Sequence, residues 1–151
     1  MIHIKLARTG ITPQSKNLKK RLKQAILATL DCVGLPENSE LTVQLSTEEV
    51  IKKLNFKFLG VDAPTDVLAF PSGDINPETE KPYLGDVIIS FSRAQKQADE
   101  GAHSIEQELE LLVVHGTLHL LGFDHADEHS KSKMWLVQQQ ILDNLGCKIN
   151  L

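Results

Sequence analysis

The run from His115 to His125, which reads H-G-T-L-H-L-L-G-F-D-H, constrains the fold more than any other stretch of this chain. His115 and His119 are four residues apart, so on a helix both side chains project from one face, a turn apart. Gly122 follows three residues later, and a glycine in the left-handed conformation ends a helix and turns the chain back. That turn can return His125 to the first two histidines. The sequence therefore predicts three imidazoles that meet at one point.

Three imidazoles with a fourth position left open form the ligand set of a catalytic zinc site, whereas structural zinc sites close all four positions, usually with cysteines. The spacing H-x3-H-x2-G-x2-H is that of the metzincin signature, which is a specific short motif. We therefore predict one zinc ion on His115, His119 and His125, with nickel as an alternative because metal affinities for imidazole sites overlap. His103 and His129 lie outside the motif, and we expect them to be solvated or capping residues.

Gly116 stands where metzincins and other zincins carry a glutamate, the general base for the zinc-bound water. A glycine accepts no proton, so peptide hydrolysis by the usual route loses its base. Three neutral ligands leave the full charge of a metal ion in place, and such an ion activates water without a neighbouring carboxylate. A phosphodiester therefore suits the predicted site better than a peptide. A metallopeptidase or other amide hydrolase is the alternative.

The residues before His115 predict a buried helix over residues 104–122. Ser104 and Gln107 have the spacing of a capping box, and the apolar residues that follow are dense enough to cover most faces of the helix. A helix of this kind is buried, which excludes competing water from a metal site. Asp124 has two open interpretations: it accepts a hydrogen bond from a ligand histidine, or it is a carboxylate that forms a turn.

Length and composition indicate an ordinary globular protein. The chain has 151 residues, of which 41% are hydrophobic and 24% charged, and we expect a single domain over residues 1–151. No apolar run approaches the length of a membrane span, so we expect a cytoplasmic protein without a membrane partner. Cys32 and Cys147 lack a C-x-x-C partner, which argues against a disulfide framework or a thiolate zinc site.

Charge alone does not indicate a nucleic-acid-binding protein, because the net charge is −4. Lysine and arginine nevertheless gather in two segments, residues 16–23 and 52–57. Such clusters usually mark a solvated face, so they permit RNA binding without requiring it.

Hydrophobic periodicity and turn residues predict the order of the elements. The predicted strands cover residues 2–7, 41–45, 66–70 and 87–91, and the predicted helices cover residues 15–33, 47–58, 92–100, 104–122 and 127–145. Residues 72–83 form a turn-rich loop between two of the strands. Because helices outnumber strands and the strands come early, we predict an α+β fold. In it, a small mixed β-sheet is packed with helices and the metal-binding helix is buried in the core.

Three blocks of the sequence together resemble the YbeY family of bacterial endoribonucleases. They are the histidine run, residues 64–71 (P-T-D-V-L-A-F-P) and residues 84–90 (L-G-D-V-I-I-S), and the similarity extends over nearly the whole chain. The resemblance implies a zincin-like fold with one zinc ion on His115, His119 and His125. It also implies a cytoplasmic, single-strand-specific endoribonuclease that matures rRNA, notably the 3′ end of 16S rRNA, and acts in ribosome quality control. The implied partners are single-stranded rRNA and the small ribosomal subunit, with no small-molecule cofactor.

Leu59 departs from the family pattern. Members commonly carry an arginine directly before the glycine that precedes the P-T-D-V block, and here Leu59 precedes Gly60. Leucine neither pairs with a phosphate nor stabilises charge in a transition state. Either another cation, Lys57 or Arg93, contacts the phosphate in place of this arginine, or the chain is a weaker nuclease. The limiting case is a non-catalytic, zinc-stabilised factor associated with the ribosome. The sequence assigns no catalytic residue beyond the three histidines.

Overall fold

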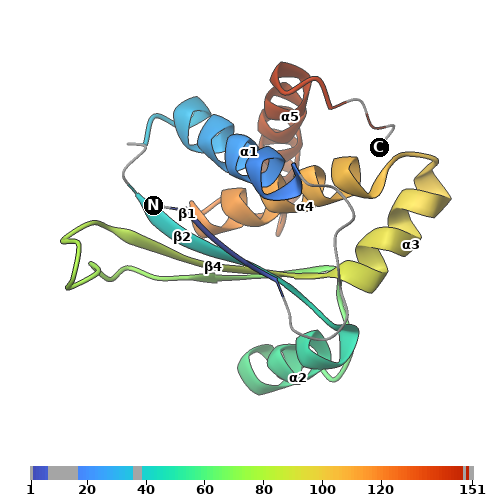
Figure 1. Cartoon of the computed structure of the whole chain (residues 1–151), viewed down its shortest axis with the longest axis horizontal. Helices are drawn as coiled ribbons and strands as arrows, with labels where there is room; N and C mark the ends of the chain where they lie inside the picture. The colour runs from blue at the N-terminus through green and yellow to red at the C-terminus, as the bar shows by residue number, and fades with distance from the viewer. Residues whose placement is uncertain (1, 7–16, 36–38, 148, 150–151) are drawn as a thin grey trace.

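The computed structural model describes residues 2–6, 17–35, 39–147 and 149 (Figure 1). Its elements follow in the order β1 (Ile2–Leu6), α1 (Leu18–Cys32), β2 (Glu40–Ser46), α2 (Glu48–Leu59), β3 (Val67–Pro71), β4 (Tyr83–Ser90), α3 (Phe91–Gly101), α4 (Ile105–Leu120) and α5 (Glu128–Asn144). Within the described residues these five helices and four strands confirm the predicted α+β class. Residue 7 of the first predicted strand and residues 15–16 of the first predicted helix lie outside the described ranges.

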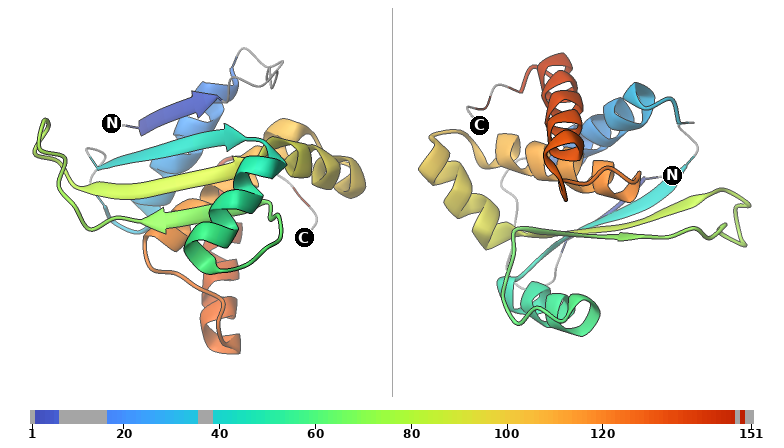
Figure 2. Two further views of the ribbon diagram at one scale, coloured as in Figure 1. Left: turned by 90° about the horizontal axis from the view of Figure 1, so that it is seen from below. Right: turned by 180° about the vertical axis from the view of Figure 1, so that it is seen from behind.

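The four strands form one mixed sheet in the order β1-β2-β4-β3. β1, β2 and β4 run parallel, and β3 runs antiparallel to β4. Parallel neighbours need a crossover connection, which α1 supplies between β1 and β2. β3 and β4 are joined instead by a long hairpin that extends away from the helices (Figure 2). β3 is therefore an edge strand of the sheet.

The helices cover the two faces of the sheet unequally. α1, α4 and α5 lie on one face and α2 lies on the other (Figures 1 and 2). α4 is the central helix, because it contacts α1, α3, α5, β3 and β4. This arrangement places the predicted metal-binding helix in the core, as expected.

Alternation along the strands divides the apolar side chains between these two layers. Leu41, Val43 and Leu45 of β2 and Val87 and Ile89 of β4 belong to the main core with α1 and α4. Ile88, between the last two, points the other way and packs with Ile51 and Leu68 under α2. The large core therefore lies between the sheet and the helix that carries His115 and His119.

β4 begins at Tyr83, four residues before the predicted start of this strand. Glycine weakens the interior of a strand, but the φ of 134° at Gly85 lets the backbone pass close to β3. A Cβ at this position would collide with the carbonyl oxygen of Phe70. β2, the neighbour of β4 on its other side, has a register shift between Glu40 and Leu41, which accommodates this irregular stretch.

Among the described residues, no helix combines the length and the apolar character needed to cross a membrane.

Candidate metal centre

α4 places two of the three predicted ligands on one face. Its start is a complete capping box: the Ser104 hydroxyl accepts from the Gln107 backbone N–H, and the Gln107 side chain accepts from the Ser104 N–H. His115 and His119 follow within the same helix, and their ring centroids are 4.7 Å apart. Their Nε2 atoms are separated by 3.2 Å. Two nitrogens bound to one tetrahedral ion at the usual Zn–N length are about 3.3 Å apart, so the spacing of the two rings fits such an ion.

The end of α4 brings the third histidine back to the first two. The Phe123 N–H donates to the Leu118 carbonyl and the Gly122 N–H to the His119 carbonyl, which is the Schellman arrangement. Gly122 has a φ of 94°, so the predicted left-handed glycine is confirmed. The reversed chain then carries His125 back across α4.

His125 completes a cluster with His115 and His119. Its ring centroid lies 6.0 Å from that of His115 and 5.2 Å from that of His119. One nitrogen from each of the three rings lies within 4.8 Å of the other two. The structure thus brings together all three histidines that the sequence predicted to meet. Their role as metal ligands stays a prediction.

The surroundings of His115 and His119 favour neutral imidazole, the form that binds a metal. Burial lowers the pKa of His115, against smaller opposing effects from its hydrogen bond with Gln138 and from the charge of Asp66. Burial also lowers the pKa of His119, and the neighbouring His115 and His125 lower it further. A hydrogen bond to the Phe123 backbone opposes the shift of the His119 pKa. Imidazole nitrogens near the tetrahedral spacing fit a zinc-like divalent ion.

Gln138 is the residue of this site that sequence reasoning missed. It lies on α5, is 2% exposed, and its Oε1 is 2.9 Å from Nδ1 of His115. An amide oxygen accepts, so Nδ1 carries the proton and Nε2 keeps its lone pair free for a metal. A signal was present: Gln138 occupies the stripe that Met134, Ile141 and Leu142 make apolar, where a polar side chain needs a buried partner.

Asp124 is a carboxylate that forms a turn, the second of the two interpretations of this residue. Its Oδ1 accepts from the backbone N–H of Ala126, 3.2 Å away, and so stabilises the turn that carries His125. It still acts on the cluster through its charge, which raises the pKa of His119 against the stronger lowering effects.

The expectation of a solvated or capping histidine, made for His103 and His129, is wrong for His103. His129 is exposed in the first turn of α5, as expected. The His103 side chain is only 9% exposed, and its Nε2 contacts Oε2 of the buried Glu108. The ring lies over Gly101, where an added Cβ would come within 2.5 Å of it. Gly101 leaves room for the ring between α3 and α4, a packing relationship that sequence spacing does not reveal.

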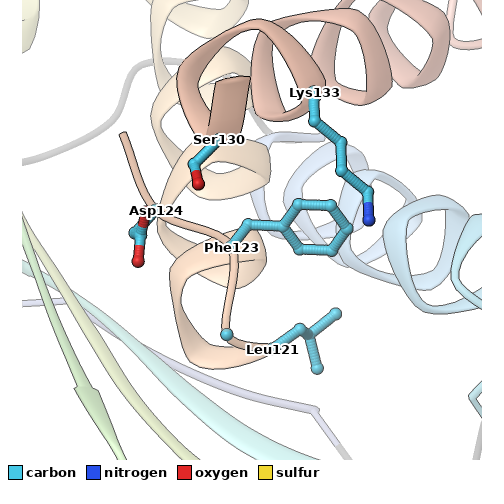
Figure 3. Close-up of a pocket in the computed structure, with 6 residues that line it drawn as sticks. Leu121, Phe123, Asp124, Ser130 and Lys133 are labelled. Atoms are coloured by element: carbon cyan, nitrogen blue, oxygen red, sulfur yellow. The ribbon is translucent and has the colours of Figure 1, made fainter. Parts of the chain in front are cut away.

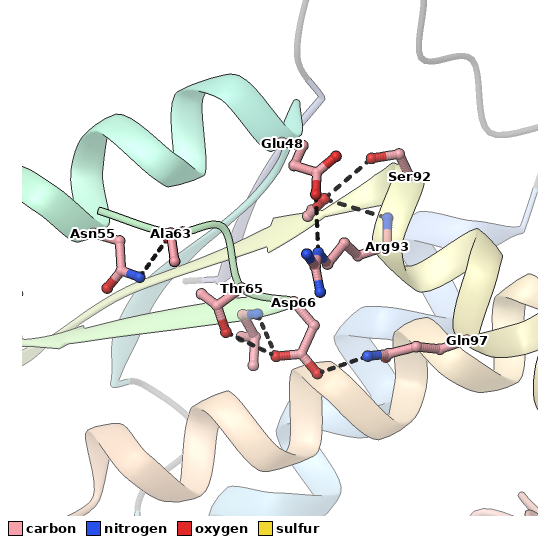
Figure 4. Close-up of polar contacts among 10 residues, drawn as sticks. Glu48, Asn55, Ala63, Thr65, Asp66, Ser92, Arg93 and Gln97 are labelled. Atoms are coloured by element: carbon pink, nitrogen blue, oxygen red, sulfur yellow. Dashed lines mark hydrogen bonds and ion pairs between the residues drawn. The ribbon is translucent and has the colours of Figure 1, made fainter. Parts of the chain in front are cut away.

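The P-T-D-V block anchors the start of β3 beside the cluster (Figure 4). The Asp66 carboxylate accepts from the Val67 N–H at 2.8 Å, from the Thr65 hydroxyl, and from the Gln97 amide on α3. The buried Asn55 of α2 donates to the Ala63 carbonyl at 2.8 Å and so holds the preceding loop. These bonds place Asp66 where its charge acts on His115.

The two cations considered as replacements for the family arginine have other surroundings. Arg93 donates through Nε to the Glu48 carboxylate at 3.0 Å (Figure 4), which offsets its charge. Lys57 lies over the ring of Phe58, on α2, and α2 is on the opposite face of the sheet from α4. Leu59 is 60% exposed at the end of the same helix.

The fold and the histidine cluster define a zincin-like α+β protein whose buried central helix presents two of three convergent imidazoles. A family model described as endoribonuclease YbeY matches residues 3–146. This chain belongs to the YbeY endoribonuclease family, as the sequence blocks implied.

Named relatives and a solved structure agree with this assignment. Endoribonuclease YbeY of Heliobacterium modesticaldum is 38% identical, with 92% of each chain covered. The same enzyme of Shouchella clausii is 37% identical over 97% of this chain and 96% of its own. The solution structure of TM1509 from Thermotoga maritima matches with a TM-score of 0.61 and 29% identity, covering 96% of this chain and 89% of that one.

Proposed function

We propose that this chain is a zinc-dependent, single-strand-specific endoribonuclease that matures the 3′ end of 16S rRNA. In this proposal one ion is held by His115, His119 and His125, and the enzyme works in the cytoplasm on the small ribosomal subunit, including in ribosome quality control. The observation that carries the proposal is the convergence of three imidazoles around Nε2 atoms 3.2 Å apart, in a chain of an endoribonuclease family.

The protein's own residues prepare the site for a cation and for an anionic substrate. Gln138 fixes the proton of His115 on Nδ1, and the Phe123 backbone orients the ring of His119. Imidazole ligands and the Gln138 amide bring no negative charge, so they do not reduce the positive charge that attracts a phosphodiester. A bound zinc ion would polarise the scissile phosphate or supply hydroxide from its water.

Gly116 argues against the peptidase alternative on geometric grounds. A Cβ at this position would lie 2.6 Å from Cγ1 of Val87 and 3.3 Å from Cγ2 of Val67, because α4 rests directly on the sheet here. The site where zincin proteases carry their glutamate therefore has no room for any side chain. Turnover of a peptide library that a chelator abolishes would contradict this argument.

The proposal is tested by metal analysis together with RNA cleavage. The purified protein is assayed on a single-stranded and a double-stranded RNA, with and without a chelator, beside His119→Ala and the control His129→Ala. His129 is an exposed histidine outside the cluster, so its loss leaves the ligand set intact. We expect the wild type and His129→Ala to hold one zinc ion and cut single strands, and His119→Ala to lose both properties.

Two outcomes would contradict the proposal. Equal cleavage by wild type and His119→Ala would remove the metal from the reaction. Zinc-loaded protein that binds ribosomal subunits but cuts no RNA, while the apo protein unfolds, would instead support the non-catalytic zinc-stabilised factor.

A further inference from the structure

A hollow opens between the end of α4 and the first turns of α5 (Figure 3). Its volume is about 280 Å³, near the lower end of the range for small-ligand pockets. Its lining residues are Leu121, Gly122, Phe123, Asp124, Ser130 and Lys133. The size suits one nucleotide unit and excludes a folded RNA element.

The loop that lines the hollow also carries the predicted third ligand. Phe123 and Asp124 directly precede His125 in the chain. The Phe123 backbone is hydrogen-bonded to the ring of His119, and the Asp124 charge acts on that ring. The hollow and the histidine cluster therefore share this loop, although none of the three histidines lines the hollow.

The charged groups divide the hollow into two sides. Figure 3 shows Asp124 at one side and Lys133 at the other, with Phe123 and Ser130 between them. The Lys133 amine lies 5.9 Å from the centroid of the Phe123 ring. The other polar groups nearby are already bonded: Asp124 accepts from the Ala126 N–H, and both the N–H and the hydroxyl of Ser130 bond the capping Asp127 carboxylate.

We infer that this hollow binds the nucleotide next to the scissile phosphodiester of a single-stranded RNA, an inference that rests on the proposed function. Lys133 contacts the phosphate of that nucleotide, and the Phe123 ring packs against its base or sugar. Asp124 repels a phosphate from the opposite side and leaves that side to the neutral donors of the base or ribose. One strand direction and one nucleotide position are thereby favoured.

Lys133 is also the cation that this part of the chain offers in place of the missing family arginine. Lys57 belongs to α2 on the far face of the sheet, and the charge of Arg93 is offset by Glu48. Lys133 instead lines a hollow that is also lined by Asp124, the residue directly before His125 in the chain. No partner carboxylate of Lys133 occurs among the ion pairs of the described residues.

The test measures RNA binding by metal-free protein, so that cleavage does not interfere. The probe is a short fluorescent single-stranded RNA, and its dissociation constant is determined across a range of salt concentrations. The variants are Lys133→Ala, Lys133→Arg and, as matched control, Lys131→Ala. Lys131 is an exposed lysine on the same helix that does not line the hollow, so its removal changes net charge equally.

We expect Lys133→Ala to weaken binding roughly fivefold, as for the loss of one exposed charge pair. The slope of log K against log salt should become shallower by about 0.7, the value for one phosphate contact on a single strand. Lys133→Arg should bind like the wild type. Phe123→Leu, which keeps apolar packing but removes the aromatic face, should weaken binding by at least about fivefold.

Three binding results would overturn the inference, and RNA cleavage by the zinc-loaded wild type shows whether the proposed function falls with it. Lys133→Ala that matches the wild type in affinity and slope, or that matches Lys131→Ala, contradicts the subsite. If the zinc-loaded wild type cuts RNA normally in that case, only the subsite falls. A wild type that binds no single-stranded RNA while metal-free contradicts the subsite, and one that also cuts no RNA when zinc-loaded contradicts the proposed nuclease as well.

Discussion

Nδ1 of His115 on α4 and Oε1 of Gln138 on α5 lie 2.9 Å apart, with Gln138 almost completely buried. The pair is separated by 23 residues in the sequence and joins the helix of the candidate metal centre to the helix that follows it. Because the acceptor is an amide oxygen, it holds the imidazole in one tautomer without adding negative charge. The ring orientation of His115 thus depends on how α5 packs against α4.

Removing this amide should weaken metal binding while leaving the three histidines in place. We expect Gln138→Leu to lower zinc affinity roughly tenfold to a hundredfold, as for the loss of a partner that orients a ligand. Gln138→Glu retains an acceptor and should retain affinity. Competition with a chromophoric chelator measures both, and Gln140→Leu on the exposed side of α5 is the control. Unchanged affinity in Gln138→Leu would show that α5 does not orient the ligand.

Gly116→Ala should destabilise the fold although alanine favours helices. The added methyl would lie 2.6 Å from Cγ1 of the fully buried Val87, and overpacking of this kind costs about 1–3 kcal/mol. The gain in helix propensity is only about 1 kcal/mol. Urea unfolding measures the difference in free energy. The double variant Gly116→Ala, Val87→Ala should lose less free energy of unfolding than the two single variants lose together, since the second change removes the clash. Strict additivity of the two losses would contradict this explanation.

Glu40 should make the stability of the fold depend on pH in the acid range. Hydrogen bonds from the Thr79 hydroxyl and the Asn76 amide lower its pKa below the ordinary value of 4.5. A carboxyl with a lowered folded-state pKa stabilises the protein above its unfolded pKa, and this contribution disappears as pH falls through the folded value. Thr79→Val should therefore be less stable than the wild type at neutral pH. The difference, measured by urea unfolding, should vanish in strong acid; a difference that stays constant with pH would exclude this cause.

The two cysteines should react very differently with thiol reagents. Cys147 is buried, and its burial, assisted by the charge of Glu110, raises its pKa to about 12, so almost no thiolate exists at neutral pH. Cys32 is exposed on α1. We expect one alkylated cysteine per folded chain and two after unfolding, as counted by mass spectrometry. Cys32→Ser should leave the folded protein unlabelled, and rapid labelling of that variant would show that Cys147 is accessible.

Features that depend on one helix and its ends could be predicted directly from the sequence. The capping box at Ser104, the four-residue spacing of His115 and His119, and the left-handed Gly122 all depend on neighbours in the sequence, and each appears in the structure as predicted. The α+β class followed from the same local periodicities. These features share a cause: a helix repeats every few residues, so spacing along the chain determines which side chains share a face.

Relationships between elements were decided by packing alone. Gln138 reaches His115 only because α5 crosses α4, and the His103 ring fits against Glu108 only because Gly101 leaves space for it. The early start of β4 depends on the close approach of Gly85 to Phe70, and the position of Lys57 depends on α2 covering the other face of the sheet. Spacing along the chain was enough to predict which histidines could share a site. What orients His115 came only from the packing of α5 on α4, because this contact joins residues far apart in the chain.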